Sequence, residues 1–186
     1  MENAGSSESE DKLKVYELIL ARYKDHIEEN EHKSVSDLRS HISPYNDFIK
    51  SLKERLFSEF RPYEYEKNFP AAARVAVDYV NGIKKVELPV SFWLGFETMD
   101  EFKVGDVIDK ALLLASLLRA LESPTAKVYI TKSRKIYIGY EWKGEQNLIN
   151  PESGSMLSGE EAQAIFTSDP IVYAFSDLYF ENYGEE

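Results

Sequence analysis

The chain has no cysteine among its 186 residues. Disulfide bonds, thiolate metal sites and catalysis by a cysteine nucleophile are therefore excluded. Histidine is also scarce. Its three copies, His26, His32 and His41, all lie near the N-terminus. From residue 42 onward the sequence offers neither a thiol nor an imidazole, the two groups on which cysteine-type acyl transfer depends.

Long hydrophobic runs are also absent. The longest apolar stretch, from Ala111 to Leu118, contains Ser116 and is far shorter than the ~20 residues that span a bilayer. The first residues, MENAGSSESEDK, are acidic and polar and lack the basic and apolar regions of a signal peptide. We therefore expect a cytoplasmic protein with no membrane span and with a disordered acidic tip over residues 1–11.

Positive charge is in the minority. Lysine and arginine total 22 against 33 aspartates and glutamates, which gives a formal net charge of −11. Proteins that bind nucleic acid present basic surfaces to the phosphate backbone, so this balance argues against a nucleic-acid partner. The apolar fraction of 43% and the charged fraction of 30% are typical of a globular domain. We expect neither a cofactor nor a resident metal.

Two amphipathic segments open the chain. In residues 12–29 apolar side chains recur every three or four positions, and residues 34–56 repeat this spacing after a polar turn. Pro44 interrupts the second segment, where Ser43 and Pro44 together predict a kink rather than an end. We expect an antiparallel helical hairpin over residues 12–60. It either packs on the rest of the domain or forms a coiled-coil arm for a partner or a second copy of the chain, giving a homodimer.

The rest of the chain, residues 61–186, mixes helical and strand patterns, which predicts an α+β domain. Pro70 is the predicted first residue of a helix that ends at Gly82. Alternating apolar and polar residues on both sides of a Ser133–Arg134 turn predict a β-hairpin. The predicted elements are helices over 70–81, 105–122, 159–166 and 169–183, and strands over 126–132, 135–142 and 146–150.

The stretch GDVIDKALLLASLLRALE, residues 105–122, has apolar side chains on nearly every side. Such a helix has to be covered all round, by a sheet on one side and by helices on the other. Its leucines are predicted to be buried: Leu112, Leu113, Leu114, Leu117, Leu118 and Leu121. The N-terminus of a helix stabilises an anion, and reactive thiolates are often found there. Here that position holds Val107.

Three segments together resemble the transglutaminase-like family: GDVIDKALLLASLLRAL, then AKVYIT with a second strand, then LINPESG. The similarity extends over residues 66–154. It implies a papain-like α+β fold in which the central helix packs against an antiparallel sheet. In that family a nucleophilic Cys precedes the helix, a general-base His opens the second strand, and an Asp follows the third. The resemblance puts these positions at Val107, at Lys135 within one or two residues, and at Asn150.

The chemistry of the family is missing at these positions. Val107 has no nucleophilic atom, and a lysine such as Lys135 is a charged acid near neutral pH rather than a base. An Asn in place of the Asp, at position 150, would by itself be compatible with catalysis, since Cys-His-Asn sites are catalytic in other proteins. The resemblance therefore implies a catalytically inactive domain, not an enzyme, that acts as a binding or scaffold module. We expect Val107, Lys135 and Asn150 to converge in the fold.

Such a module would keep a cleft between the start of the 105–122 helix and the sheet. The aromatic connection before the helix could help to line it. The residues predicted to line the cleft are Trp93, Asp106, Asp109, Tyr137, Tyr140 and Trp142. Any single aromatic residue of this set is better explained as part of the core than as a ligand contact.

Two other functions stay open. Asp106 and Asp109 could bind a metal or act as acid and base in a hydrolase or metal-dependent enzyme with replaced chemistry. Both are also favourable residues at a helix start without any catalytic purpose. The chain could instead be an assembly protein that uses its N-terminal helical hairpin. The expected partner is an unidentified protein or peptide.

Overall fold

The structure of the protein is a computed structural model that describes Ala21, residues 35–86 and residues 94–184. The predicted acidic tip, nearly all of the predicted helix over 12–29, and Trp93 lie outside the described residues. Among the residues that are described, no helix combines the length and the apolar character that a membrane span requires.

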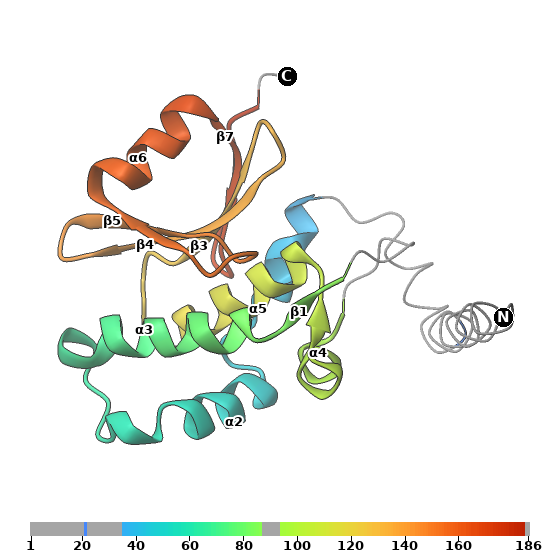
Figure 1. Cartoon of the computed structure of the whole chain (residues 1–186), viewed down its shortest axis with the longest axis vertical. Helices are drawn as coiled ribbons and strands as arrows, with labels where there is room; N and C mark the ends of the chain where they lie inside the picture. The colour runs from blue at the N-terminus through green and yellow to red at the C-terminus, as the bar shows by residue number, and fades with distance from the viewer. Residues whose placement is uncertain (1–20, 22–34, 87–93, 185–186) are drawn as a thin grey trace, which may run out of the picture. The chain divides into compact units, whose positions relative to one another are not determined.

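A six-stranded antiparallel sheet, with strand order β6-β5-β4-β3-β7-β8, lies at the centre of the fold. Its strands are β3 (Lys127–Thr131), β4 (Ile136–Trp142), β5 (Glu145–Ile149), β6 (Met156–Ser158), β7 (Ile171–Phe175) and β8 (Phe180–Asn182). Two short parallel strands, β1 (Lys84–Lys85) and β2 (Val104–Gly105), pair separately. The helices are η1 (Val35–His41), α2 (Asp47–Leu56), η2 (Ser58–Phe60), α3 (Tyr65–Asn81), α4 (Phe96–Phe102), α5 (Val107–Ala120) and α6 (Gly159–Ser168), where η marks a 3-10 helix. In Figure 1, α6 covers one face of the sheet, while α5, α3 and α2 lie on the other side.

Helix α5 is the centre of the hydrophobic core. The leucines that the sequence predicts to be buried are all at most 2% exposed. Strands β3 and β4 contact the helix from the sheet, and α2 and α3 contact it from the helical layer. Its buried hydroxyl, on Ser116, accepts a hydrogen bond from the Ser43 amide at 3.1 Å and donates to the Leu112 carbonyl at 2.8 Å. The prediction of a helix buried on all sides is confirmed.

Residues 34–56 do not form the single kinked helix that their apolar spacing predicts. The 3-10 helix η1 ends at His41, and α2 begins anew with Asn46 as its N-cap, whose Oδ1 accepts from the Phe48 amide at 2.8 Å. Tyr45 belongs to the apolar positions that recur every three or four residues in this segment, which predicts its burial, but it is 78% exposed. Helix α2 packs against α5, where Lys53 Nζ donates to the Ala120 carbonyl at 2.6 Å.

Helix α3 begins at Tyr65 rather than at Pro70, which lies inside it. A proline at this position removes one helical hydrogen bond. Packing offsets the loss, because Phe69 is fully buried and its ring stacks on Trp142 with centroids 5.3 Å apart. The predicted end of the helix at Gly82 is confirmed, since Gly82 follows its last residue and acts as the C-cap.

The C-terminal segment forms strands β7 and β8 where the sequence predicts a helix over 169–183. Asp169 is not the N-cap of a helix there; it is the C-cap of α6, where its amide donates to the Ile165 carbonyl at 2.9 Å. Its carboxylate accepts hydrogen bonds from Thr131 Oγ1 at 2.7 Å and from the Ser133 amide at 3.0 Å, which tie the start of β7 to the β3–β4 turn. The β-branched and aromatic residues of β7 suit a pleated strand, and pairing with β3 overrides the local helix-start signal.

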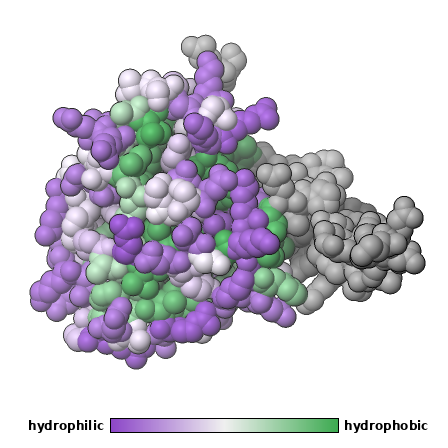
Figure 2. All heavy atoms as spheres, in the orientation of Figure 1, coloured by the Kyte–Doolittle hydropathy of each residue, from purple (hydrophilic) through white to green (hydrophobic). Residues whose placement is uncertain are grey.

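Hydrophilic side chains cover most of the described surface seen in Figure 2, and apolar residues show in patches between them. Among the described residues, the large apolar side chains that are exposed lie on separate elements. They are Tyr45 before α2, Phe102 in α4, Leu178 between β7 and β8, and Tyr183 after β8. Apolar residues exposed one at a time are normal on a protein surface and imply no partner.

Gly139 in β4 leaves room for the ring of Tyr129 on β3. A Cβ atom at this position would lie 2.3 Å from Tyr129 Cε2 and 3.0 Å from Gln146 Nε2. We expect Gly139→Ala to lower the free energy of unfolding by about 1–3 kcal/mol in urea denaturation, because the ring or the strand has to move. Gly95→Ala is the control: among the described residues its Cβ would meet only Glu97 Oε2, at 3.8 Å. Because Gly95 is the N-cap of α4, where alanine is less favourable than glycine, we expect a cost of at most about 1 kcal/mol. Equal stability of the two variants would contradict this packing.

Candidate functional site

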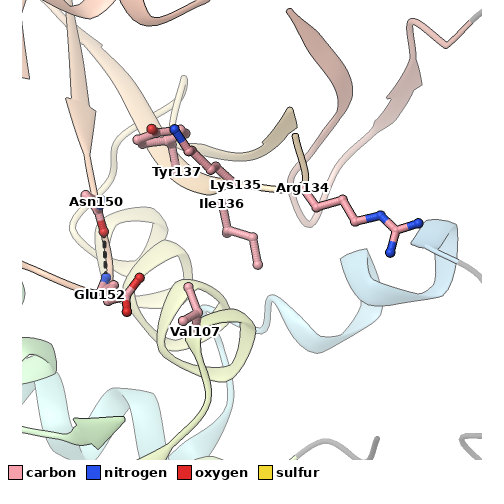
Figure 3. Close-up of a pocket in the computed structure, with 7 residues that line it drawn as sticks. All are labelled: Val107, Arg134, Lys135, Ile136, Tyr137, Asn150 and Glu152. Atoms are coloured by element: carbon pink, nitrogen blue, oxygen red, sulfur yellow. Dashed lines mark hydrogen bonds between the residues drawn. The ribbon is translucent and has the colours of Figure 1, made fainter. Parts of the chain in front are cut away.

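A pocket of about 320 Å³ opens where the start of α5 meets the sheet. Its lining comes from α5, from the β3–β4 turn with the start of β4, and from the turn that follows β5. The lining residues, drawn in Figure 3, are Val107, Arg134, Lys135, Ile136, Tyr137, Asn150 and Glu152. The structure thus brings Val107, Lys135 and Asn150 to one pocket, as the sequence leads us to expect.

Two aspartates fix the start of α5. Asp106 is the N-cap, and its Oδ1 accepts a hydrogen bond from the Asp109 amide at 2.8 Å. The Asp109 carboxyl in turn accepts from the Asp106 amide at 3.2 Å and from the Leu94 amide at 3.2 Å. This reciprocal arrangement is a capping box, which satisfies amides that the first helical turn leaves without partners. The carboxyls of both residues are therefore committed to the backbone.

Burial changes the ionisation of this pair. Asp109 is only 1% exposed, and desolvation, reinforced by the charge of Asp106, raises the pKa of its carboxyl to about 7. Desolvation also raises the pKa of Asp106. Neither residue is among those that line the pocket. Asp106 and Asp109 lie at the helix start, as predicted, but their carboxyls are used for capping and do not form a wall of the cleft.

Ile136 is the residue at the start of β4 whose side chain points toward Val107 in Figure 3. Side chains alternate along a strand, so those of Lys135 and Tyr137 point to the opposite side. There the Tyr137 ring contacts Phe166 of α6, with centroids 6.2 Å apart. The strand therefore presents an isoleucine to the start of α5, one residue after the lysine at which the sequence puts the general-base position.

Asn150 follows β5 and is held by the turn that it starts. Its Oδ1 accepts hydrogen bonds from the Glu152 amide at 2.8 Å and the Ser153 amide at 3.3 Å. Its Nδ2 donates to no group within the described part of the chain. The Glu152 carboxylate accepts from Lys85 Nζ at 2.8 Å. Asn150 thus presents hydrogen-bond donors to the pocket, whereas an Asp would present only acceptors when ionised.

Comparison with known proteins bears on the fold. No protein-family model matches the chain, and no curated protein matches it. Calcium-bound LapG of Legionella pneumophila is similar in structure, with a TM-score of 0.50 at 12% identity over 72% of this chain and 90% of LapG. EGTA-treated LapG gives a TM-score of 0.49 at 12% identity over 82% of this chain and 87% of that one. LapG has a transglutaminase-like fold.

This chain has a transglutaminase-like fold. The α+β class and the central helix against an antiparallel sheet, both expected from the sequence, are confirmed. At 12% identity the likeness extends to the fold and not to the roles of single residues.

Two aromatic residues predicted to line the cleft lie elsewhere in the fold. The rings of Tyr140 and Trp142 contact Phe69 of α3, with centroids 5.2 and 5.3 Å apart. Neither lines the pocket. A strand advances about 3.3 Å per residue, so β4 carries both away from Ile136 and the start of α5. Of the other two predicted aromatic residues, Tyr137 lines the pocket and Trp93 lies outside the described residues.

Three lining residues are not singled out by sequence reasoning: Arg134, Ile136 and Glu152. Ile136 has a detectable signal, since the alternation of β4 puts it on the same face as the buried Ile138. Arg134 gives no such signal, because a basic residue in a β-turn is normally a solvated charge. Glu152 enters the pocket only through the turn that Asn150 organises.

Proposed function

We propose that the protein is a catalytically inactive transglutaminase-like domain that binds a peptide or protein segment in the pocket at the start of α5. The observation that supports this is the lining of that pocket. Val107, Ile136 and Asn150, contributed by its three walls, include neither a nucleophile nor a base. Because the chain has no cysteine, acyl transfer through a thiolate has no starting atom.

The carboxyl groups in and beside the pocket are engaged in other contacts. Glu152, the carboxylate of the lining, is paired with Lys85 at 2.8 Å. The carboxyls of Asp106 and Asp109 are hydrogen-bonded to backbone amides, and Asp109 is buried. Lys135 directs its side chain away from Val107. Replaced chemistry at the two aspartates, which the sequence leaves open, therefore gains no support from the geometry.

The size and the character of the pocket are those of a ligand site. Val107 and Ile136 give it an apolar floor, and Arg134, Asn150 and Glu152 add charged and amide groups to its lining. Ligand sites are typically apolar with a few placed polar groups, and volumes of about 300 Å³ are at the small end of their range. A pocket of about 320 Å³ holds one or two peptide side chains more readily than a large cofactor.

Assembly through the N-terminal hairpin is a separate hypothesis. The apolar face of α2 is already covered, since Ile49 and Leu52 are at most 1% exposed and the helix packs against α5. That face is therefore not free for a partner. The other predicted helix of the hairpin, over 12–29, lies outside the described residues apart from Ala21.

Val107→Trp is expected to abolish peptide binding, because the indole occupies the pocket. The measurement is an NMR titration of the ¹⁵N-labelled chain with a pool of blocked pentapeptides. In the wild-type chain the shift changes should centre on the amides of Val107, Ile136 and Asn150. They should disappear in Val107→Trp while the spectrum stays that of a folded protein. Val172→Trp, on the half-exposed part of β7, is the control and should bind like the wild-type chain.

Two results would contradict the proposal in different ways. Hydrolysis or crosslinking of the peptides by the wild-type chain would show that the domain is an enzyme. Shift changes that persist in Val107→Trp, or that centre on another surface, would show that this pocket is not the binding site.

A further inference from the structure

We infer that this pocket binds the carboxylate side chain of an acidic peptide, with Arg134 as the anchoring cation. The inference rests on the proposed binding function and names the chemistry of its ligand. Three properties of the lining carry it. They are a guanidinium without a partner among the described residues, hydrogen-bond donors that outnumber free acceptors, and an apolar floor.

Arg134 is available to pair with an anion. It occupies the β3–β4 turn in a left-handed backbone conformation, with φ 64°, and its amide donates to the Thr131 carbonyl at 2.8 Å. Its guanidinium makes no hydrogen bond or ion pair with any of the described residues. A guanidinium binds a carboxylate through two parallel hydrogen bonds. In a chain of net charge −11, such an uncompensated cation at a pocket points to an anionic ligand.

The other charges around the pocket are compensated within the fold. Glu152 is paired with Lys85 at 2.8 Å, so its carboxylate is not a free anion facing the ligand. Lys135 lies near Asp169, and hydrogen bonds from Ser133 and Thr131, together with the charge of Lys135, lower the pKa of that carboxyl. Among the described charged residues of the lining, Arg134 is therefore the one whose charge has no partner in the fold and can pair with a ligand.

The uncharged polar group of the lining also favours an acceptor-rich ligand. Both side-chain hydrogen bonds of Asn150 use its Oδ1, and its Nδ2 remains as a donor. In Figure 3, Arg134 and Lys135 extend to either side of Ile136, whose side chain points toward Val107. A peptide that crosses this floor can pair a side-chain carboxylate with Arg134 and a backbone carbonyl with Asn150.

The apolar floor of the pocket and its volume favour a carboxylate side chain over other anions. Val107 and Ile136 offer apolar contact to the methylene groups of a glutamate, which a bare phosphate lacks. A pocket of about 320 Å³ holds one or two side chains, and a single free guanidinium cannot neutralise a run of phosphates. An acidic peptide therefore fits the lining better than nucleic acid does.

Two dye-labelled peptide pools test the inference: acetyl-X-X-Glu-X-X-amide and acetyl-X-X-Gln-X-X-amide, in which X is an uncharged residue. By fluorescence anisotropy we expect the Glu pool to bind about tenfold or more tightly than the Gln pool, since a charge-assisted bidentate pair is lost on amidation. Arg134→Gln should remove the difference, and Arg134→Lys should restore part of it. Lys132→Gln makes the same charge change in the same turn but outside the lining, so it should keep the difference.

The outcomes separate this inference from the proposed function. Equal binding of the two pools, still abolished by Val107→Trp, would overturn the choice of an acidic ligand and leave the binding function standing. A preference for Glu that survives Arg134→Gln would overturn the role of Arg134. If free glutarate displaced the Glu pool as well as an unlabelled Glu peptide does, the ligand would be a small dicarboxylate and not a peptide. Binding of neither pool would overturn both proposals.

Discussion

Asp109→Asn should make the chain more stable relative to wild type as the pH rises. Between about pH 5 and about pH 8 we expect its advantage in free energy of unfolding to grow by about 2–3 kcal/mol. The cause is the buried carboxyl of Asp109, which is 1% exposed and has its pKa raised to about 7 by desolvation and by the charge of Asp106. Asparagine reproduces the shape of the protonated carboxyl and cannot ionise.

The sign follows from proton binding. In the unfolded chain Asp109 ionises near its ordinary pKa of about 3.9, whereas in the folded chain it keeps its proton up to about pH 7. The folded state therefore binds more protons between these values. Stability from this group is complete below about pH 4 and is lost as the pH rises through about 7. In Asp109→Asn the side-chain oxygen that replaces the carboxyl can still accept a hydrogen bond from a backbone amide, and it does so at every pH.

Urea denaturation of both chains at several pH values measures this effect. Asp47→Asn is the control, because Asp47 is a solvent-exposed carboxylate of α2 that pairs with Lys50. Its difference from wild type should stay within about 0.5 kcal/mol at each pH. If the stabilities of Asp109→Asn and wild type ran parallel from pH 5 to 8, Asp109 would have to be ionised throughout, and the account of its burial would be wrong.

The core of the fold can be predicted because its signals are local. The apolar side chains on nearly every side of α5 and the acidic residues at its start need no knowledge of distant contacts, and both aspects are confirmed. The β3–β4 hairpin is equally local, since its two strands flank one short turn. Strand β7 is different. It pairs with β3 from far along the chain, and Asp169 and Pro170 before it mimic a helix start.

The sequence predicts which segments form the walls of the candidate site, but it does not predict which side chains of those segments face the pocket. The resemblance uses positions on α5, at the start of β4 and after β5, and the structure brings these to one pocket. A shift of one residue along a strand, however, moves a side chain to the other face of the sheet. This is why Ile136, and not Lys135, faces Val107. The resemblance locates the start of the strand only within one or two residues, so it does not predict which of Lys135 and Ile136 faces Val107.

The C-terminal end of α5 is held by a largely buried ion pair. The side chains of Arg119 and Asp177 are only 11% and 13% exposed. Arg119 donates from Nε to Asp177 Oδ1 at 2.6 Å and from Nη2 to Oδ2 at 3.3 Å. Its Nη1 also donates to the Ser123 carbonyl at 2.6 Å. The pair joins the central helix to the β7–β8 connection, a contact between distant parts of the sequence.

Asp177→Asn should therefore lower the free energy of unfolding by about 2–4 kcal/mol, because it leaves the Arg119 charge buried without its anion. In a urea-denaturation double-mutant cycle, Arg119→Met and Asp177→Asn together should cost less than the sum of the single changes, by about 1–3 kcal/mol. Glu64→Gln breaks the exposed pair with Lys67 and should cost less than about 0.5 kcal/mol. Additive single changes, or an Asp177→Asn cost no larger than that of Glu64→Gln, would contradict a coupled buried pair. Because the pocket lies at the opposite end of α5, folded Asp177→Asn should bind the same peptides as wild type.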